Sequence, residues 1–257
     1  MASPSLDRFA SRLGSTTSFE AALDVLAENV RGLGFIAVDY ANLSAAQVLD
    51  GSWAASPIFE RNFPLGWQRS WRVHGRFDAL LPHCYHSGLP VDWQDYRRRA
   101  ALDQGQLRAF ACLDDLGFPG GLSIPIHLPA NRFAFISAVS GETGERWETL
   151  CKKSRTPLTV LAHGFHHLLA ERGLSTEQPA SVRLTRREVE CLHHAARGYS
   201  APATARQINR SVETVRRHLK DAMSKLGART IAQAVAIAVA CGLLAPKRPD
   251  EVGSSSS

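Results

Sequence analysis

The sequence lacks every motif that would mark it as an enzyme. It contains no GxSxG nucleophile turn, no P-loop and no GxGxxG dinucleotide fingerprint. Histidines cluster at residues 83–86 and 163–167, but neither cluster has the second pair of ligands that a zinc site needs. We therefore predict a protein that is not an enzyme and has no catalytic residue, no metal and no cofactor.

Long apolar runs and paired cysteines are also missing. No apolar stretch approaches the roughly 18 residues that suggest a transmembrane helix, and residues 1–14 lack the apolar core of a secretory signal. The five cysteines, at positions 84, 112, 151, 191 and 241, show no CxxC spacing. An odd number scattered along the chain is typical of reduced thiols. We expect a cytoplasmic protein with no membrane partner.

Basic charge is abundant only near the C-terminal end. The whole chain has a net charge of +6. Residues 181–244 contain eleven Arg and Lys against four Asp and Glu, which gives +7, and residues 245–257 are neutral, so residues 1–180 carry about −1. A local excess of this kind indicates a surface for phosphates, and double-stranded DNA is the partner we expect.

Four short helices are predicted within this basic segment. Thr185 and Glu188 have the spacing of a capping box, and Ser200 followed by Pro202 is a typical start of a second helix. A turn at residues 209–211 leads into a third helix, and the almost wholly apolar "TIAQAVAIAVACGLL" forms the fourth. Two helices joined by so short a turn are typical of a helix-turn-helix DNA reader.

The third helix, residues 211–227, has an apolar stripe on one side and basic side chains on the other. Arg216 and Lys220 lie one turn apart, with Arg217 beside them. A basic run on an isolated helix is more often a solvated surface than a binding surface. The neighbouring helices and the local charge favour DNA. The apolar stripe comprises Val215, Leu219, Ala222, Met223 and Leu226.

The pattern "LTRREVECL…KLG…AVAIAV…GLL" resembles the C-terminal DNA-binding domain of the LuxR family of transcriptional regulators, over roughly residues 183–244. The resemblance implies that Arg216 and Lys220 read base edges. It implies that Thr214 and Arg217 hold the DNA backbone or the fold, whereas His218 is equally well explained by packing. Ala203 and Thr204 depart from the family pattern, which usually has Glu and Ile there.

The first 170 residues mix helical and strand patterns. We predict an α+β domain, a small antiparallel sheet flanked by helices, which can enclose one ligand cavity. It is joined to an all-α four-helix helix-turn-helix domain. The predicted elements are helices at 18–34, within 91–117 and at 156–174, and strands at 35–43, 121–128 and 132–141, the last two as a hairpin.

These patterns predict two domains. Residues 1–171 are expected to bind a ligand and to dimerise, and residues 184–244 to bind DNA. The polar segment 172–183, with a glycine and a proline, is a plausible linker, and residues 245–257 are expected to be a disordered tail. The apolar fourth helix offers more apolar surface than so small a domain covers internally, which predicts a homodimer.

Residues 62–93 are unusually rich in aromatic side chains. Such a stretch is as often plain core as the wall of a binding site. Its order resembles the acyl-homoserine lactone-binding domain of quorum-sensing LuxR regulators, over roughly residues 15–170. The resemblance implies that Trp67 donates to a lactone carbonyl, Asp78 accepts the ligand amide proton and Trp93 covers the lactone ring. Gly121 would permit a close approach of strands. The implied ligand-binding residues are Phe63, Trp67, Trp71, Asp78, Trp93 and Ser137, of which Ser137 would donate to the acyl carbonyl.

The same region departs from that family at several positions. Phe63 and Trp71 stand where tyrosines are usual, and Ala79 replaces a proline. The spacing from Trp67 to Asp78 is two residues shorter than usual. These departures leave the acyl chain, and even the ligand class, open.

The leading hypothesis is a ligand-responsive regulator that binds a palindromic promoter site as a dimer. One alternative is an orphan regulator of the same family that acts without a lactone or responds to another small molecule. A phosphorylation-switched receiver would need an acidic pair after its first strand, where only Asp39 is found. An enzyme fused to a DNA-binding domain would need a nucleophile and base that we do not find.

Overall fold

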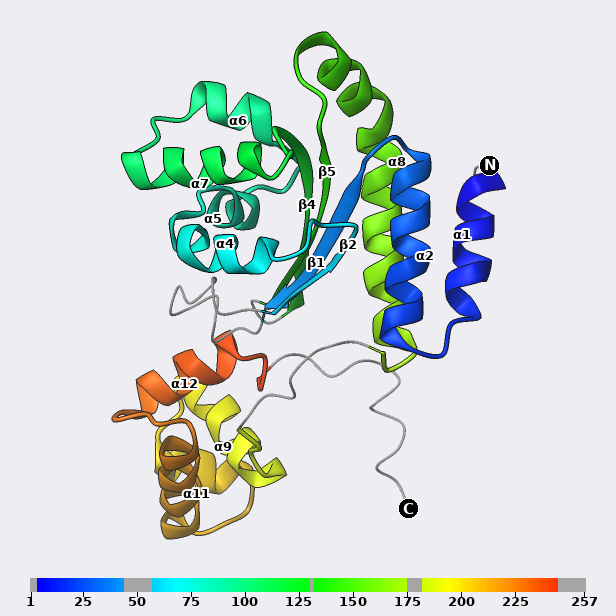
Figure 1. The fold of residues 1–257 in the computed structure, drawn as a ribbon. Coiled ribbons are helices and arrows are strands. Elements are labelled where there is room, and N and C mark those ends of the chain that lie inside the picture. The colour runs from blue at the N-terminus through cyan, green and yellow to red at the C-terminus, as the bar shows by residue number, and fades with distance from the viewer. Residues whose placement is uncertain (1–3, 44–56, 130–131, 175–181, 245–257) are drawn as a thin grey trace. The chain divides into compact units, whose positions relative to one another are not determined.

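The computed structural model describes residues 4–43, 57–129, 132–174 and 182–244 (Figure 1). The chain divides into two compact units. Among the described residues, the N-terminal unit contains the sheet and helices α1, α2 and α4 to α8, and the C-terminal unit contains helices α9 to α12. Most of the predicted linker 172–183 and all of the predicted tail 245–257 lie outside the described residues.

A five-stranded sheet forms the centre of the N-terminal unit, in the order β2-β1-β5-β4-β3. The predicted strand at 35–43 and the predicted hairpin are confirmed as β1, β4 and β5. Two short edge strands, β2 and β3, were not predicted, because four and two residues are too few to show an alternating pattern. The strands are β1 (Ala37–Leu43), β2 (Ile58–Arg61), β3 (Val91–Asp92), β4 (Gly120–Leu128) and β5 (Arg132–Ser140).

Helices cover both faces of this sheet (Figure 1). The helix predicted at 18–34 is confirmed as α2, and the helical segment 91–117 forms α6 and α7. The helix predicted at 156–174 begins much earlier, at Gly144, because Pro157 is tolerated inside α8. On one face lie α1 (Pro4–Gly14), α2 (Phe19–Gly32) and α8 (Gly144–Glu171). On the other lie α4 (Trp67–His74), α5 (Leu80–His86), α6 (Trp93–Arg99) and α7 (Gln104–Asp115).

Strand β1 sends alternate side chains to the two faces. The Tyr40 ring packs 5.3 Å from the Phe165 ring of α8, and its hydroxyl lies 3.0 Å from Nδ1 of His166. His166 is therefore a packed core histidine. Asp39, the preceding residue, faces the side of the sheet that carries α4 to α7. Asp39 is buried, with 8% of its surface exposed.

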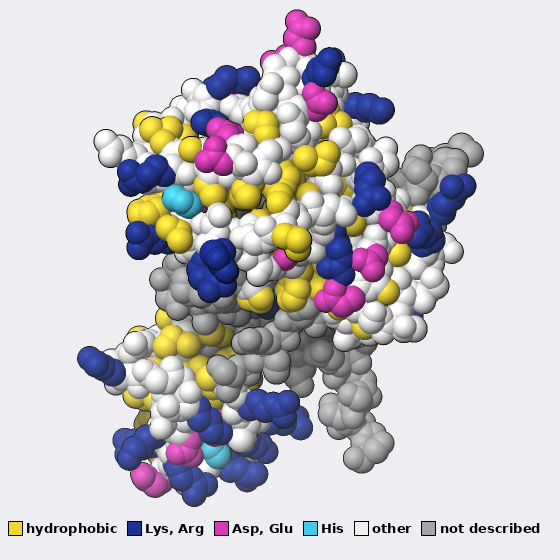
Figure 2. All heavy atoms as spheres, viewed as in Figure 1, with side chains coloured by type: hydrophobic (Ala, Val, Ile, Leu, Met, Phe, Trp, Pro, Cys, Tyr) yellow, Lys and Arg dark blue, Asp and Glu magenta, His cyan; other side chains and the backbone are white. Residues whose placement is uncertain are grey.

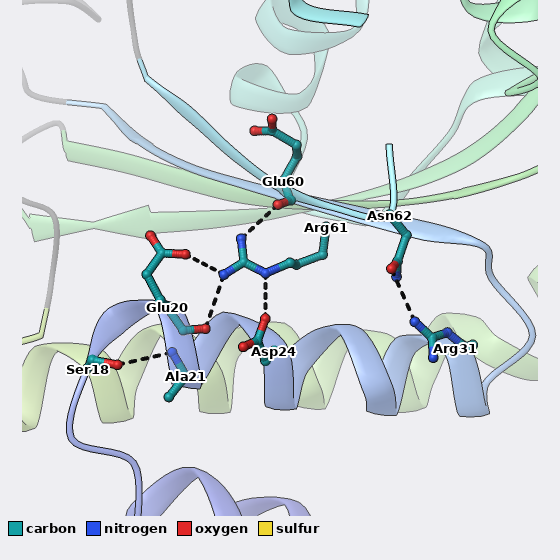
Figure 3. A network of polar contacts seen from close by, with 8 residues as sticks. All are labelled: Ser18, Glu20, Ala21, Asp24, Arg31, Glu60, Arg61 and Asn62. Carbon is teal, nitrogen blue, oxygen red and sulfur yellow. Dashed lines mark hydrogen bonds and ion pairs between the residues drawn. The ribbon is translucent and has the colours of Figure 1, made fainter. Parts of the chain in front are cut away.

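An ion-pair network fastens the edge strand β2 to α2 (Figure 3). The Arg61 guanidinium pairs with Glu20 and, at 2.5 Å, with Asp24, which lie one turn apart on α2. Ser18 caps this helix by accepting the amide proton of Ala21. The network holds the short strand in place because four residues of ladder alone give little stability.

The C-terminal unit consists of four short helices around one apolar core. The helices are α9 (Arg186–Ala196), α10 (Ala201–Gln207), α11 (Val212–Lys225) and α12 (Ile231–Ala240). Val215, Leu219 and Ala222 of α11 are buried in this core, as the predicted stripe requires. The predicted capping box of Thr185 and Glu188 and the N-cap of Ser200 are present.

An ion pair between the buried Glu188 and the solvent-exposed Lys225 joins α9 to α11. Both carboxylate oxygens of Glu188 lie 2.8 Å from Nζ of Lys225, and one also accepts the amide proton of Thr185. Burial alone would raise the pKa of Glu188, but these hydrogen bonds outweigh it and hold that pKa below its ordinary value. The carboxylate therefore stays charged and fully partnered.

Candidate functional site

A cavity of about 670 Å³ lies in the N-terminal unit. One wall is formed by β1, β4 and β5 of the sheet, and the other by α4, α5 and the chain between them. Its size is that of a pocket for a small organic ligand. In Figure 2 hydrophobic side chains gather on the face of the unit that carries these helices. All six ligand-binding residues implied by the sequence line it: Phe63, Trp67, Trp71, Asp78, Trp93 and Ser137.

Four of these six residues that line the cavity are aromatic. The Phe63 ring lies 4.6 Å from that of Trp67. Glycines make room for the two other indoles. A Cβ at Gly75 would come within 2.9 Å of Nε1 of Trp71. A Cβ at Gly121 would come within 2.4 Å of the Trp93 ring. Gly121 therefore admits an indole, which differs from the strand approach predicted for it.

The indole N–H of Trp67 is buried and has no hydrogen-bond partner among the described residues. Trp67 itself is 6% exposed. Indole nitrogen can only donate, and a buried donor without an acceptor costs about 1–3 kcal/mol. A ligand oxygen in the cavity would remove this cost.

Asp78 presents a carboxyl to the same cavity. It accepts the amide protons of Leu80, at 2.8 Å, and Leu81, at 3.3 Å, and so caps the start of α5. Burial nevertheless raises the pKa of Asp78 to about 6. A carboxylate has about four acceptor sites, so these two contacts leave capacity for a ligand donor.

A hydrogen-bond chain crosses the sheet wall of the cavity. Nε1 of Trp93 donates to Oγ of Ser123 at 2.8 Å, and Oγ of Ser123 lies 2.9 Å from Oγ of Ser137. Ser137 contacts Asp39 through its amide, at 3.3 Å, and through its hydroxyl. The chain fixes the indole of Trp93 against β4.

Sequence reasoning missed Asp39 and Ser123 as cavity residues. Both line the cavity. Asp39 was considered only as part of a receiver site. A signal was available in principle, since the carboxylate of Asp39 alternates with Ala37 and Ala41 and so stands on the same side of the strand "AVDYANL" as these two apolar residues. Ser123 gave no such signal, because its position depends on the pairing of β4 with the neighbouring strands.

The second candidate site is the solvent side of α11. Arg216, Arg217 and Lys220 are exposed there, opposite the buried apolar stripe. Thr214 is half-buried, and its hydroxyl lies 2.8 Å from that of Ser211, the N-cap residue. His218 is half-buried as well. Figure 2 shows Lys and Arg side chains gathered on the C-terminal unit.

Other functional features can be stated only for the described part of the chain. There, no three His, Cys, Asp or Glu side chains lie together as metal ligands would. The same residues include no helix with the length and hydropathy of a bilayer span.

A ligand-sized cavity in an α+β unit, combined with a helix-turn-helix unit, defines a ligand-responsive transcriptional regulator. The family comparisons agree with this class. Residues 18–169 match the autoinducer binding domain, and residues 182–238 match the bacterial regulatory proteins of the luxR family. The chain belongs to the LuxR family of regulators with an autoinducer-binding domain and is not an enzyme.

Relatives that are similar over most of this chain are named as transcriptional activators. The transcriptional activator protein VanR of Vibrio anguillarum is 30% identical over 72% of this chain and 76% of its own length. The transcriptional activator protein BjaR1 of Bradyrhizobium diazoefficiens is 28% identical over 75% and 78%. The function that follows is that of a ligand-responsive, quorum-sensing type of DNA-binding regulator.

Solved structures share the fold. Escherichia coli SdiA superposes with a TM-score of 0.72 at 16% identity, covering 93% of this chain and 98% of that one. SdiA in complex with octanoyl-rac-glycerol gives a TM-score of 0.73 at 16% identity, covering 96% and 100%. At this identity the likeness concerns the fold alone.

Proposed function

We propose that the protein senses an acyl-homoserine lactone or a closely related acyl signal and binds a palindromic promoter site as a homodimer in the cytoplasm. The observation that carries this proposal is the pairing, in one cavity, of a buried donor without a partner and a carboxyl with free acceptor sites. These are the Trp67 indole N–H and Asp78. An acyl lactone has a carbonyl for the first and an amide proton for the second.

Each cavity residue then has a role. Trp67 donates to the lactone carbonyl, Asp78 accepts the amide proton, and Trp93 covers the lactone ring. Phe63 and Trp71 bound the cavity beside them. Ser137 donates to the acyl carbonyl, which requires its hydroxyl to turn away from Asp39, since a hydroxyl has one proton.

A second candidate ligand is an acyl ester without a lactone ring. SdiA, which has a similar fold, was solved with octanoyl-rac-glycerol. Such a ligand has a carbonyl for Trp67 and hydroxyls in place of the amide proton. The third alternative is an orphan regulator that needs no lactone.

For DNA, we propose that Arg216 and Lys220 read base edges in the major groove. Arg217 and Thr214 would then hold the phosphate backbone and the start of α11. An Arg can fork onto the two acceptors of guanine, while Lys offers a point charge. The dimer would use α12, where Ile231 is 43% exposed and Val239 is 54% exposed.

The test is the melting temperature of the full chain with and without a panel of acyl lactones and octanoylglycerol. A ligand at a hundred times its dissociation constant stabilises the fold by about 2.7 kcal/mol. Trp67→Phe removes the donor and keeps an aromatic ring, and Asp78→Ala removes the acceptor. Both should abolish the ligand-dependent shift. If no acyl compound stabilises the wild type, the ligand-free alternative takes the place of this proposal.

A further inference from the structure

The cavity holds a second carboxyl where an acyl arm would meet the sheet. Asp39 faces the cavity from β1 and is 8% exposed. In the β1–β5 register it stands directly opposite Ser137, and Ala41 stands opposite Phe135, which also lines the cavity. A wall built only to hold an alkyl chain would have apolar side chains at all of these positions.

The hydrogen-bond chain on this wall makes Asp39 an acceptor. The Trp93 indole can only donate, so Ser123 receives its proton and is free to donate onward to Ser137. Ser137 in turn directs its hydroxyl and its amide at Asp39. Each donor therefore points toward this carboxyl, and these hydrogen bonds oppose the effect of burial, which raises its pKa.

Basic side chains in the described part of the chain do not pair with the two cavity carboxyls. Among the described residues no ion pair joins Asp39 or Asp78 to a basic side chain. The charged groups that act on Asp39 are acidic: Asp78 in the cavity and Glu60, which stands opposite Asp39 on β2. Arg72 and Arg76 line the cavity but are exposed.

A separate observation shows that this cavity is incomplete without a ligand. Trp67 lines the cavity, and its buried N–H has no acceptor among the described residues. The cavity therefore offers one unused donor and two carboxyls with unused acceptor sites. An acyl lactone with a plain alkyl arm would satisfy Trp67 and Asp78 and leave Asp39 against hydrocarbon.

We propose that Asp39 is a specificity-determining residue that selects ligands whose acyl arm carries a hydrogen-bond donor, a hydroxyl or an ammonium group, over ligands with a plain alkyl arm. This inference rests on the proposed function and adds the substrate class. Because Asp39 neighbours Ser137, which is assigned to the acyl carbonyl, the donor belongs within one or two carbons of that carbonyl.

Four lactones of equal chain length test the proposal. They are N-octanoyl-homoserine lactone and its 3-oxo, 3-hydroxy and 3-amino derivatives, which present no polar group, an acceptor, a neutral donor and a cationic donor. Dissociation constants for the full chain follow from tryptophan fluorescence, since Trp67, Trp71 and Trp93 line the cavity. We expect the 3-hydroxy or 3-amino compound to bind roughly 10- to 100-fold more tightly than the octanoyl compound. This is the gain in affinity that one hydrogen bond to a charged group provides. Whichever donor binds more tightly identifies the natural group.

Two variants assign the preference to Asp39. Asp39→Leu should remove it and bring the donor-bearing and plain lactones to within about twofold of each other. Asp39→Asn keeps the size and presents an NH₂ group, so its preference should move toward the 3-oxo compound. This variant decides the matter if Asp39→Leu does not fold. Glu60→Gln, which removes the neighbouring charge outside the cavity, should keep the wild-type preference.

Two outcomes separate this inference from the proposed function. If the wild type binds all four lactones alike, or if Asp39→Leu keeps the donor preference, the role of Asp39 is overturned while lactone sensing stands. If none of the four binds, lactone sensing fails and the role of Asp39 fails with it.

Discussion

The two units of this regulator differ in how their buried carboxylates are partnered. In the helical unit, Glu188 is 3% exposed and both of its oxygens reach Lys225. In the cavity, Asp39 and Asp78 have no ion pair with a described residue, and the Trp67 N–H has no partner there. Native proteins rarely leave buried polar groups unsatisfied, and such groups are common at binding sites.

This difference predicts which unit is stabilised by a ligand. In the helical unit the buried carboxylate is paired. Nδ1 of His194 is also buried there without a partner among the described residues, but His194 does not line the cavity, so the stability of this unit should not change when a signal is added. The N-terminal unit has one buried donor without a partner, Trp67, and two cavity carboxyls with free acceptor sites, Asp39 and Asp78. A ligand that binds these groups adds directly to the free energy of unfolding of this unit. Signal binding and folding should therefore be coupled in the first unit only.

The largest expected effect on stability comes from breaking the ion pair between Glu188 and Lys225 in the helical unit. Lys225→Met leaves the buried Glu188 carboxylate without its cation. Because the Lys225 side chain is 39% exposed, the expected cost is about 3 kcal/mol, the low end of the range for a buried pair. Because α9 and α11 then lose their ion pair, DNA binding should fall as well. Urea denaturation of the full chain, followed by hydrogen exchange of α9 and α11, measures the loss. Arg206→Met, at an exposed position of α10, is the control and should change stability by less than about 0.5 kcal/mol.

A second predicted effect is that the stability of the N-terminal unit depends on pH through Asp39. Burial raises the pKa of Asp39 to about 7, against the hydrogen bonds from Ser137. The unfolded chain ionises this group near pH 4, so the folded protein binds more protons between these values and loses stability as the pH rises. The loss is about 1.4 kcal/mol per pH unit, which is on the order of 3 kcal/mol between pH 5 and pH 7. Asp78 and Glu60 are the other acids that act on this group and its surroundings.

Asp39→Asn removes this titration and leaves that of Asp78 in place. Without ligand, the difference in unfolding free energy between the variant and the wild type should therefore grow in favour of the variant from pH 5 to pH 8. Parallel curves for the two proteins would show that Asp39 is not protonated in the folded state.

A third prediction concerns α12, the apolar face that the helical unit leaves exposed. If this face lies in a dimer, Val239→Asp places a charge in an apolar contact and should weaken association by about 2 kcal/mol or more. Sedimentation velocity with and without operator DNA measures it. Ala196→Asp, at an exposed position of α9, should leave the dimer intact. A wild type that binds a single half-site tightly as a monomer would contradict the proposal.

The helical unit could be predicted from sequence almost completely, because its rules are local. Capping residues such as Thr185 and Ser200, and glycines with positive φ such as Gly227, fix the ends of the helices within a few residues. The apolar stripe of α11 follows from a spacing of three and four residues. None of these signals depends on a distant part of the chain.

The cavity could be predicted only where side chains share one stretch. Phe63, Trp67, Trp71 and Asp78 fall within a single aromatic run. Asp39 and Ser123 join them only through the pairing of strands far apart in sequence. Helices α4 and α5 were not predicted either, because aromatic and glycine residues give a weak helical pattern.

A smaller effect separates the roles of two neighbouring cations on α11. Arg216→Ala should reduce specific affinity by about 1–3 kcal/mol and relax base preference at one position. Arg217→Ala should weaken binding to all sequences alike and reduce the slope of log K against log salt by about one. Binding isotherms on operator and scrambled DNA at several salt concentrations distinguish the two. Equal slopes with unchanged specificity in both variants would contradict the assignment.

The smallest effect is expected from Phe63→Tyr, which adds one hydroxyl to the cavity wall. The Phe63 ring is half-buried and lies 4.9 Å from that of Phe118, so the substitution keeps the packing and should leave the ligand-free protein within about 0.5 kcal/mol of the wild type. In the lactone-binding family that this chain resembles, a tyrosine is usual here. The added hydroxyl supplies a donor or an acceptor to whatever fills the cavity.

The sign of its effect on ligand binding therefore reports the chemistry of the ligand beside that wall. An acyl lactone presents carbonyl oxygens, so Phe63→Tyr should leave its affinity equal or improve it by up to about 1 kcal/mol. A ligand with a bulky or aromatic group there would leave the hydroxyl unsatisfied or displaced, and its affinity should fall by a similar amount. Melting curves of wild type and Phe63→Tyr with matched alkyl and aryl lactones measure both cases. Because Trp71 also stands where a tyrosine is usual, a loss of affinity for alkyl lactones with a gain for aryl lactones would show that the two aromatic residues together shape this cavity for an aryl signal.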